Sequence, residues 1–509
     1  MYSRVRSAAL NGIEAEEIFV ESDISRGFPS FTIVGLPDTA IRESKERVRA
    51  AVVNSGFSFP DRRVTVNLSP AGVRKVGTHF DLPIALCILI SSGMKVKREI
   101  LEYVFIGELA LDGSIGRVRG LLPMIRGLSE KGIRKFIIPE KNRKEGQLTE
   151  DVEVLCAGCL DDVVRFIRDG IQLCSAGERE DMERTGPELD FADVSGQEQA
   201  KRALLIAAAG MHNILMSGSP GSGKTMLAKR LPGILPPMTG DEMMEVTKIY
   251  SICGLLDEEK PLISSRPFRE PDHTITPAAL IGGGKKVKAG EVSLAHNGVL
   301  FLDELPEFSR NSIEALRKPM EDKEVTISRL SGSVTLPSCF LTVAAMNPCP
   351  CGYFGDPCRS CTCSEGQIRN YRSRLSGPFL DRIDLYVYVR TPDYEEIHEH
   401  RKGVSSEEMA EGVRRARERQ EVRFQEDGIR FNSQMKADQI RKYCRMENEA
   451  EVLFRQAFLR MRLSVRSHDR ILKVARTIAD LEGHEIIKAS DAAEAVQYKS
   501  GGDLFRQEL

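Results

Sequence analysis

The feature that most limits the fold of this chain is the octapeptide GSPGSGKT at residues 218–225. It follows the short apolar run NILMS and opens the helical segment TMLAKRL. A glycine-rich turn between a strand and a helix lets backbone N–H groups point at phosphate oxygens, and the helix N-terminus adds partial positive charge. The sequence therefore predicts a phosphate-binding loop made of Gly218, Ser219, Pro220, Gly221, Ser222, Gly223, Lys224 and Thr225.

Within this loop, Lys224 is expected to neutralise the β- and γ-phosphates of ATP, and Thr225 to offer its hydroxyl to Mg²⁺. A second apolar run, GVLFLDE at 298–304, ends in two carboxylates. We expect Asp303 to hold the Mg²⁺ and Glu304 to polarise the attacking water as general base. A third run, FLTVAAMN, ends at Asn347, whose amide is expected to orient that water.

The length and patterning of the chain indicate several domains. At 509 residues it exceeds the ~250–300 residues at which single cores stop growing. Polar residues 172–192 form a predicted linker after an N-terminal domain of residues 1–171. Short apolar strands alternate with helices over 193–391, which predicts an α/β core with a parallel sheet. Apolar residues then recur at helical spacing over 392–509.

Composition excludes few functions by itself. The formal net charge is −2, so any nucleic-acid surface must come from local clusters of Lys and Arg. The sequence contains no apolar stretch long enough to span a membrane and no apolar signal core at its start. We therefore expect a cytoplasmic protein without membrane contact.

Longer strings carry a family resemblance. GLPDTAIRESKERVRAAV, VNLSPAGVRK, HNGVLFLDELPEF, MNPCPCGY and RLSGPFLDRIDL resemble the magnesium-chelatase-like AAA+ ATPases, in particular their ComM (YifB-type) branch. The resemblance runs from the N-terminus to about residue 505. It implies an α/β AAA+ P-loop core with a C-terminal helical lid, and ATP and Mg²⁺ as ligands.

The resemblance also implies catalytic arginines. Arg382, in GPFLDRIDL, matches the arginine finger that reaches the ATP of a neighbouring subunit. Arg470, in SHDRILKVARTIADLEG, matches the lid arginine that senses the γ-phosphate, with Arg466 as a rival. A surface salt bridge is the alternative interpretation of each. A finger supplied by a neighbour implies a homo-oligomeric ring, which in this family is usually a hexamer.

The resemblance also implies two insertions, of which the lysine-bearing one is a candidate pore loop. EVTISRLSGSVTL predicts a β-hairpin, because two alternating strands flank Ser331, Gly332 and Ser333. The run GGGKKVKAG at 282–290 carries Lys285, Lys286 and Lys288 on flexible backbone. Such lysines are candidates to follow the phosphates of DNA through a ring. A solvated basic loop is the alternative.

Five cysteines cluster between residues 349 and 363. Two close pairs supply the four thiolates that zinc prefers, although C-x-C is tighter than the usual C-x₂-C. The resemblance to ComM-like sequences at the first and last pairs selects Cys349, Cys351, Cys361 and Cys363, with Cys358 as a possible substitute. Free thiols remain the alternative.

The N-terminal domain resembles the α+β Lon-protease-like fold of the ribosomal S5 type. A Lon-type protease needs a serine nucleophile and a lysine base. The corresponding positions here hold His79 and Leu122, so we expect a non-proteolytic module for ring assembly or DNA contact.

The leading functional hypothesis is a DNA translocase that acts on single strands and branched junctions. It follows from the resemblance, since ComM-like proteins drive branch migration of recombination intermediates during natural transformation. The alternative is a chelatase-type or protein-remodelling motor that does not act on DNA.

Overall fold

The computed structural model divides the chain into two compact units, which we describe separately. Unit 1 comprises residues 1–183, 240–263 and 328–334, and unit 2 comprises the remainder. The described residues are 1–73, 75–97, 101–177, 189–283, 288–329, 332–357, 359–391, 403–461 and 463–504. Along this described part of the chain, no helix has the length and hydropathy needed to cross a bilayer.

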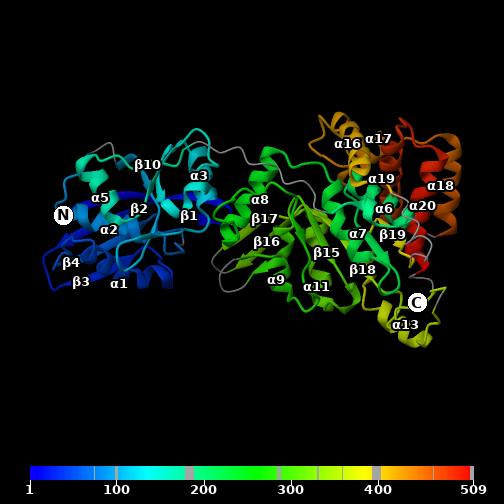
Figure 1. The fold of residues 1–509 in the computed structure, drawn as a ribbon, viewed down its shortest axis with the longest axis horizontal. Helices are drawn as coiled ribbons and strands as arrows, with labels where there is room; N and C mark the ends of the chain where they lie inside the picture. The colour runs from blue at the N-terminus through cyan, green and yellow to red at the C-terminus, as the bar shows by residue number, and fades with distance from the viewer. Residues whose placement is uncertain are drawn as a thin grey trace. The chain divides into compact units, whose positions relative to one another are not determined.

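Unit 1 is built on an eight-stranded mixed sheet in the order β10-β9-β8-β5-β1-β2-β4-β3 (Figure 1). Strands β1, β2 and β4 pair antiparallel, whereas β3, β5, β8 and β9 join through parallel pairings. The bounds are β1 Tyr2–Asn11, β2 Glu14–Ser25, β3 Ser30–Val34, β4 Arg63–Ser69, β5 Val104–Phe105, β8 Lys135–Pro139, β9 Glu153–Ala157 and β10 Cys174–Ser175.

Helices cover both faces of this sheet, because its strands bury apolar side chains on each side. One core packs under α1 (Thr39–Asn54), α2 (Asp81–Ser91) and α5 (Leu160–Asp169). The other lies under α3 (Leu121–Glu130). Strand β10 falls inside the predicted linker, yet it pairs with β9 as the last strand of the sheet.

A segment from the middle of the sequence also belongs to unit 1. Helix α8 (Gly240–Cys253) lies between the phosphate loop and Asp303 along the chain, but it packs with α3. Met244 and Leu262 share a small apolar core with Leu122 and Leu148. The Ser251 backbone carbonyl accepts a hydrogen bond of 3.0 Å from the Gly120 N–H.

Unit 2 contains a five-stranded parallel sheet in the order β12-β15-β18-β11-β19. Three of its strands lie where the apolar runs predict them, namely β11 Ile214–Ser217, β15 Val299–Leu302 and β18 Leu341–Met346, and a fourth is β19 Leu385–Tyr388. The edge strand β12, Phe268–Arg269, was not predicted. The expected α/β core is therefore present.

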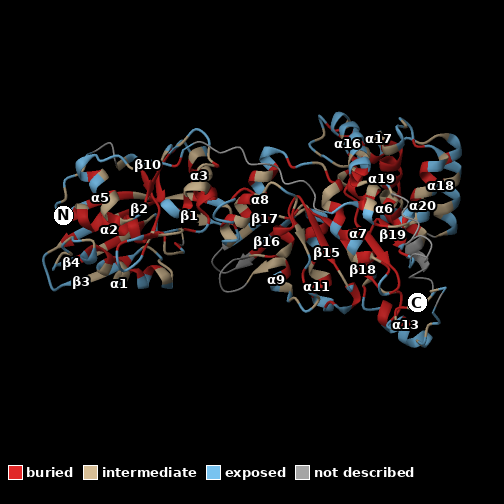
Figure 2. Ribbon diagram, viewed as in Figure 1, coloured by how far each residue is buried: buried red, intermediate tan, exposed pale blue. Residues whose placement is uncertain are grey.

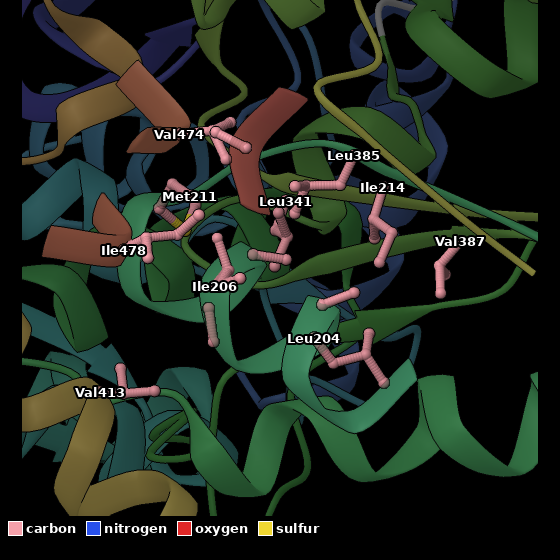
Figure 3. Close-up of a cluster of buried hydrophobic side chains, with 14 of the residues drawn as sticks. Leu204, Ile206, Met211, Ile214, Leu341, Leu385, Val387, Val413, Val474 and Ile478 are labelled. Carbon is pink, nitrogen blue, oxygen red and sulfur yellow. The ribbon is translucent and has the colours of Figure 1, made fainter. Parts of the chain in front are cut away.

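The C-terminal helices share one hydrophobic core with this sheet (Figure 3). Val413 of α16 and Val474 of α19 belong to the same cluster as Leu204 of α6 and Ile214 of β11. Figure 2 shows β15 and β18 as buried, with exposed residues on the outer faces of α16 and α18. The helices are α6 Glu198–Gly210, α16 Ser406–Arg423, α17 Ala437–Tyr443, α18 Asn448–Arg460, α19 Val465–Glu482 and α20 Ala489–Leu504.

Two small hairpins complete the description. The predicted one is confirmed, because β16 (Glu324–Arg329) and β17 (Gly332–Pro337) form a two-stranded sheet. The second pairs β13 (Gly282–Gly283) with β14 (Lys288–Ala289). Lys285 and Lys286 lie outside the described residues, and only the backbone of Lys288 is described.

Candidate active site

The candidate site lies where three neighbouring parallel strands end. Ser217 at the end of β11 pairs with Met346 of β18, and Leu302 at the end of β15 pairs with Ala344. The residues that follow these strands are the phosphate loop, Asn347 and Asp303. The parallel register thus brings three segments that are distant in sequence to one edge of the sheet.

The phosphate loop needs glycine at defined positions. Gly221 and Gly223 have φ of +78° and +93°, in the left-handed region that favours glycine. Gly218 lies so close to the neighbouring strand that a Cβ there would be 2.1 Å from the Val389 carbonyl oxygen. Helix α7 (Lys224–Arg230) begins directly after Gly223. The loop thus has the strand–turn–helix context and the glycine conformations that the octapeptide predicts, and phosphate binding itself stays a prediction.

Lys224 is a largely buried cation, 8% exposed. Its Nζ donates to the carbonyl oxygens of Gly218 at 2.7 Å and Ser219 at 3.0 Å, and lies 3.3 Å from Asn347 Oδ1. Burial lowers the pKa of the Lys224 ammonium, and the nearby Asp303 carboxylate partly offsets this effect. A buried ammonium whose close partners are neutral oxygens is well placed to gain from an incoming phosphate.

The two predicted magnesium ligands touch each other. Thr225 Oγ1 donates to Asp303 Oδ2 at 2.8 Å. A hydroxyl beside a carboxylate fits the preference of Mg²⁺ for oxygen ligands, so these residues suit the ion that the fold implies. Glu304 follows with its side chain 59% exposed and a φ of +50°. It therefore points away from the buried strand and is accessible to water.

His273 is a neighbour of Glu304 that the sequence did not reveal. Its Nδ1 lies 3.8 Å from Glu304 Oε2. His273 follows β12, the edge strand beside β15, and this pairing brings the imidazole to the proposed general base. The only signal in the sequence was a histidine in the segment before Asp303, and a two-residue strand gives no usable periodicity.

The four selected cysteines converge on one point. Their sulfur atoms all lie within 4.8 Å of one another, and Cys349 Sγ is 3.4 Å from Cys351 Sγ and 3.6 Å from Cys361 Sγ. A zinc ion with bonds of about 2.3 Å in a tetrahedron separates sulfurs by about 3.8 Å. The donor set therefore fits zinc. Cys358, the possible substitute, lies outside the described residues.

The cysteine loop packs directly on the phosphate loop. Gly352, at φ +88°, lies so close to Pro220 that a Cβ would come within 2.5 Å of its Cδ. The Ser219 hydroxyl donates a short hydrogen bond to the Asp356 carboxylate. Asn347 also precedes the first cysteine by two residues. The cluster is therefore connected to the candidate site twice, through Asn347 along the chain and through its packing on the phosphate loop.

Arg382, the predicted finger, is held within its own chain. Its Nη2 lies 2.7 Å from Glu321 Oε2, and its Nε donates to the Arg317 carbonyl oxygen at 3.1 Å. The guanidinium side chain is 8% exposed. To reach a neighbouring subunit, Arg382 would have to leave these partners.

Arg470 is likewise engaged. Its Nη1 donates to Asp384 Oδ1 at 2.6 Å and to the Arg382 carbonyl oxygen at 3.1 Å. Burial alone would raise the pKa of Asp384, but the charge of Arg470 and the hydrogen bond from His212 hold that pKa well below its ordinary value. The rival Arg466 is exposed in the first turn of α19. The roles of Arg382 as a finger and of Arg470 as a sensor both remain predictions.

The positions of the absent protease dyad are buried. Leu122 has no exposed surface, and His79 is 5% exposed with its Nε2 2.9 Å from the Ala8 carbonyl oxygen. Desolvation lowers the pKa of His79 to about 4, so the imidazole is neutral at pH 7. Both side chains serve the core of unit 1.

Comparisons with known proteins agree with this geometry. The family model of the magnesium chelatase subunit ChlI matches residues 190–397, and further models of that subunit match 20–142 and 403–499. Competence protein ComM of Haemophilus influenzae is 42% identical over 504 residues, which cover 97% of each chain. The YifB protein of Escherichia coli is 40% identical over 499 residues, covering 98% of this chain and 97% of the relative.

A more distant relative is a subunit of magnesium chelatase. The magnesium-chelatase 38 kDa subunit of Cereibacter sphaeroides is 24% identical over 219 residues, or 40% of this chain and 59% of that protein. The ComM and YifB proteins thus match over nearly their full length, whereas the chelatase subunit shares only a part of the chain. The chain belongs to the magnesium-chelatase-like AAA+ proteins of the ComM and YifB type.

Proposed function

We propose that this protein hydrolyses ATP with Mg²⁺ at the edge of the unit 2 sheet. The observation that carries the proposal is the contact of Thr225 with Asp303 beside the buried Lys224. Thr225 and Asp303 would hold the Mg²⁺, which helps to neutralise charge on the phosphates. Lys224 would exchange its carbonyl partners for phosphate oxygens, and Glu304 would accept the proton of the attacking water.

We further propose that hydrolysis drives translocation on DNA and branch migration of recombination intermediates. Support comes from the full-length similarity to a competence protein. The two hairpins, β13–β14 and β16–β17, are inserted on either side of Asp303 along the chain. Hairpins with basic residues at such positions suit contact with a phosphate backbone. Lys285, Lys286 and Lys288 are the candidates.

The motor is proposed to work as a homo-oligomeric ring, with a hexamer as the expected state. Stabilising charge on the transferred phosphoryl group takes a cation beyond Lys224. Arg382 of a neighbouring subunit is the candidate for that cation. A ring would thus make each site complete only at a subunit boundary.

We also propose that Cys349, Cys351, Cys361 and Cys363 bind zinc and brace the phosphate loop. Zinc content of the purified protein, released by a mercurial and measured with a chromogenic chelator, should be about one per chain. The double variant Cys349→Ser, Cys361→Ser should lose it. Cys444→Ser, which alters a buried cysteine outside the cluster, is the control.

The decisive test is the ATPase rate with and without single-stranded DNA and four-way junctions. Lys224→Ala serves as the control that abolishes hydrolysis. A several-fold stimulation by DNA, together with ATP-dependent processing of the junctions, would support the translocase. Hydrolysis that depends on Lys224 but ignores every DNA would refute the DNA proposal and favour a chelatase-type or protein-remodelling motor.

A further inference from the structure

Unit 1 carries a cluster of arginine and phenylalanine residues that lies far in sequence from the two hairpins. The segments 24–31 and 55–63 contain Arg26, Arg62 and Arg63, four phenylalanines, and a single acidic residue, Asp61. Both segments lie at one end of strands β2, β3 and β4. We call this end, with those two segments, the β3 edge. Strand β3 is the outermost strand of the sheet there.

The β3 edge brings these residues together through its register. Arg63 pairs with Ser25 at the end of β2 and with Ser30 at the start of β3. The loop between β2 and β3 passes over it, since a Cβ on Gly27 would lie 3.8 Å from Arg63 Cβ. That loop carries Arg26 and Phe28, so both residues lie on the loop that approaches Arg63, and Arg62 directly precedes Arg63.

Phe28 is the most exposed large apolar side chain among the described residues, at 92%. Close to it, Phe31 and Phe59 form an aromatic pair with centroids 5.7 Å apart. The Arg49 guanidinium of α1 lies 5.7 Å from the Phe59 ring centroid. The β3 edge therefore contains an aromatic pair that an arginine of α1 approaches.

The arginine charges of the β3 edge are not neutralised within the chain. Arg26, Arg62 and Arg63 are exposed, and none has an ion pair among the described residues. The nearby Asp23 lies 3.4 Å from the amino terminus instead. Three exposed guanidinium groups without a described ion pair, on the same edge as a protruding aromatic ring, complement an anion that presents flat faces.

We propose that the β3 edge binds single-stranded nucleic acid, with arginines on the phosphates and Phe28 stacked on a base. This inference rests on the proposed function, because it gives the DNA motor a second contact with its substrate, on unit 1. Single strands fit better than duplex, because paired bases leave no free face for Phe28. The apolar residues Val34 and Leu36 lie at the opposite end of β3 and are separate.

The test measures binding of the full chain to a fluorescent oligo(dT) by anisotropy over a salt series. Phe28→Ala should weaken binding about tenfold, with an unchanged salt dependence, whereas Phe28→Trp should preserve it. The pair Arg62→Ala, Arg63→Ala should weaken binding and reduce the slope of log K against log salt by roughly 0.7 per lost phosphate contact.

The control pair Arg165→Ala, Arg168→Ala removes the same charge from the same unit. Both arginines are exposed and paired with Asp161 and Asp169 on α5. Equal losses in the two arginine pairs, or full binding by Phe28→Ala, would overturn the inference. If those variants bind normally while DNA still stimulates the ATPase, the inference fails alone. If the unaltered chain binds no oligo(dT) and DNA leaves hydrolysis unchanged, both proposals fail.

Discussion

The Arg382 guanidinium lies 2.7 Å from the Glu321 carboxylate of its own chain, at the position where the family resemblance implies a finger for a neighbouring subunit. Glu321 is 44% exposed, so the pair sits at the surface of α12 (Arg317–Asp322) with Arg382 beneath it. We propose that Glu321 holds the Arg382 guanidinium by this ion pair until the nucleotide of a neighbouring subunit competes for it.

Two substitutions separate a finger from a structural ion pair. Arg382→Ala should lower kcat by about a thousandfold if the guanidinium acts on the transferred phosphoryl group. Glu321→Gln should keep or raise kcat, because it releases the arginine. If Arg382 only supports the fold, both variants should instead lose thermal stability together, which a melting curve of each would reveal. In mixtures, Arg382→Ala subunits should regain hydrolysis when combined with Lys224→Ala subunits.

The contact between Gly352 and Pro220 predicts that the cysteine loop controls the phosphate loop. Gly352→Ala places a methyl group against the Pro220 ring and should displace the loop, weakening ATP binding about ten- to hundredfold. Gly355→Ala is the matched control. Gly355 has a similar φ of +77°, but a Cβ added there would have nothing within 4 Å. Binding is measured with a fluorescent ATP analogue. Equal affinities of the two variants would contradict the coupling.

Much of the candidate site could be predicted, because its residues lie directly after strands that can be recognised from the local sequence. The glycines, Lys224 and Thr225 follow one strand directly, and Asp303 and Asn347 end two others, so strand recognition alone places them together. His273 and the packing of Gly352 against Pro220 could not be found this way. Each depends on which segments become neighbours, and short segments such as β12 leave no periodic signal.

The same limit applies to α8. Its apolar residues indicate a buried face. Nothing in the pattern says that Met244 shares a core with Leu122 of unit 1, rather than packing on the unit 2 sheet whose strands precede and follow α8 in the sequence. The ion pairs of the two arginines could not be predicted from the sequence either, because the partners of Arg382 and Arg470 come from distant segments. Local propensity predicts elements, whereas tertiary contacts decide how charges pair.

A buried charge network predicts a strong effect on the stability of unit 2. Asp480 is fully buried and accepts hydrogen bonds from Arg423 at 2.8 Å and Asn432 at 2.8 Å, while Arg476 Nη2 lies 3.0 Å away. Asp480→Ala would leave Arg476, 1% exposed, without its counter-charge. We expect a loss of roughly 3 to 5 kcal/mol in the free energy of unfolding.

Urea unfolding followed by circular dichroism would measure this loss. The control is Glu418→Ala, which removes a carboxylate that is 55% exposed and paired with Arg414 on α16. An exposed ion pair of this kind contributes about 0 to 1 kcal/mol. Similar unfolding midpoints for the two variants would show that the network around Asp480 is not important for stability.

His79 predicts how unit 1 responds to acid. Desolvation lowers the pKa of His79 to about 4 in the folded chain, against about 6.5 for an unfolded histidine. Between these values the unfolded chain binds a proton that the folded chain does not, so stability is complete above pH 6.5 and falls as the pH drops toward 4. The loss from this group is on the order of 3 kcal/mol. Gln at this position can still donate to the Ala8 carbonyl but does not titrate, so His79→Gln should flatten the pH profile.

The chain contains no tryptophan, so a chemical probe is the better readout for unit 1. Oxidation of the buried Met124 by hydrogen peroxide across a urea series, followed by mass spectrometry, reports the unfolding of this unit. Desolvation raises the pKa of the nearby Asp81 to about 6, so this carboxyl acts in the opposite direction in both chains. From pH 7 to pH 4.5 the midpoint of the unaltered chain should therefore move to lower urea relative to that of His79→Gln. His273→Gln, in unit 2 and 40% exposed, should leave the shift intact. An identical shift in all three chains would contradict the prediction, because it would mean that groups other than His79 set the acid response of unit 1.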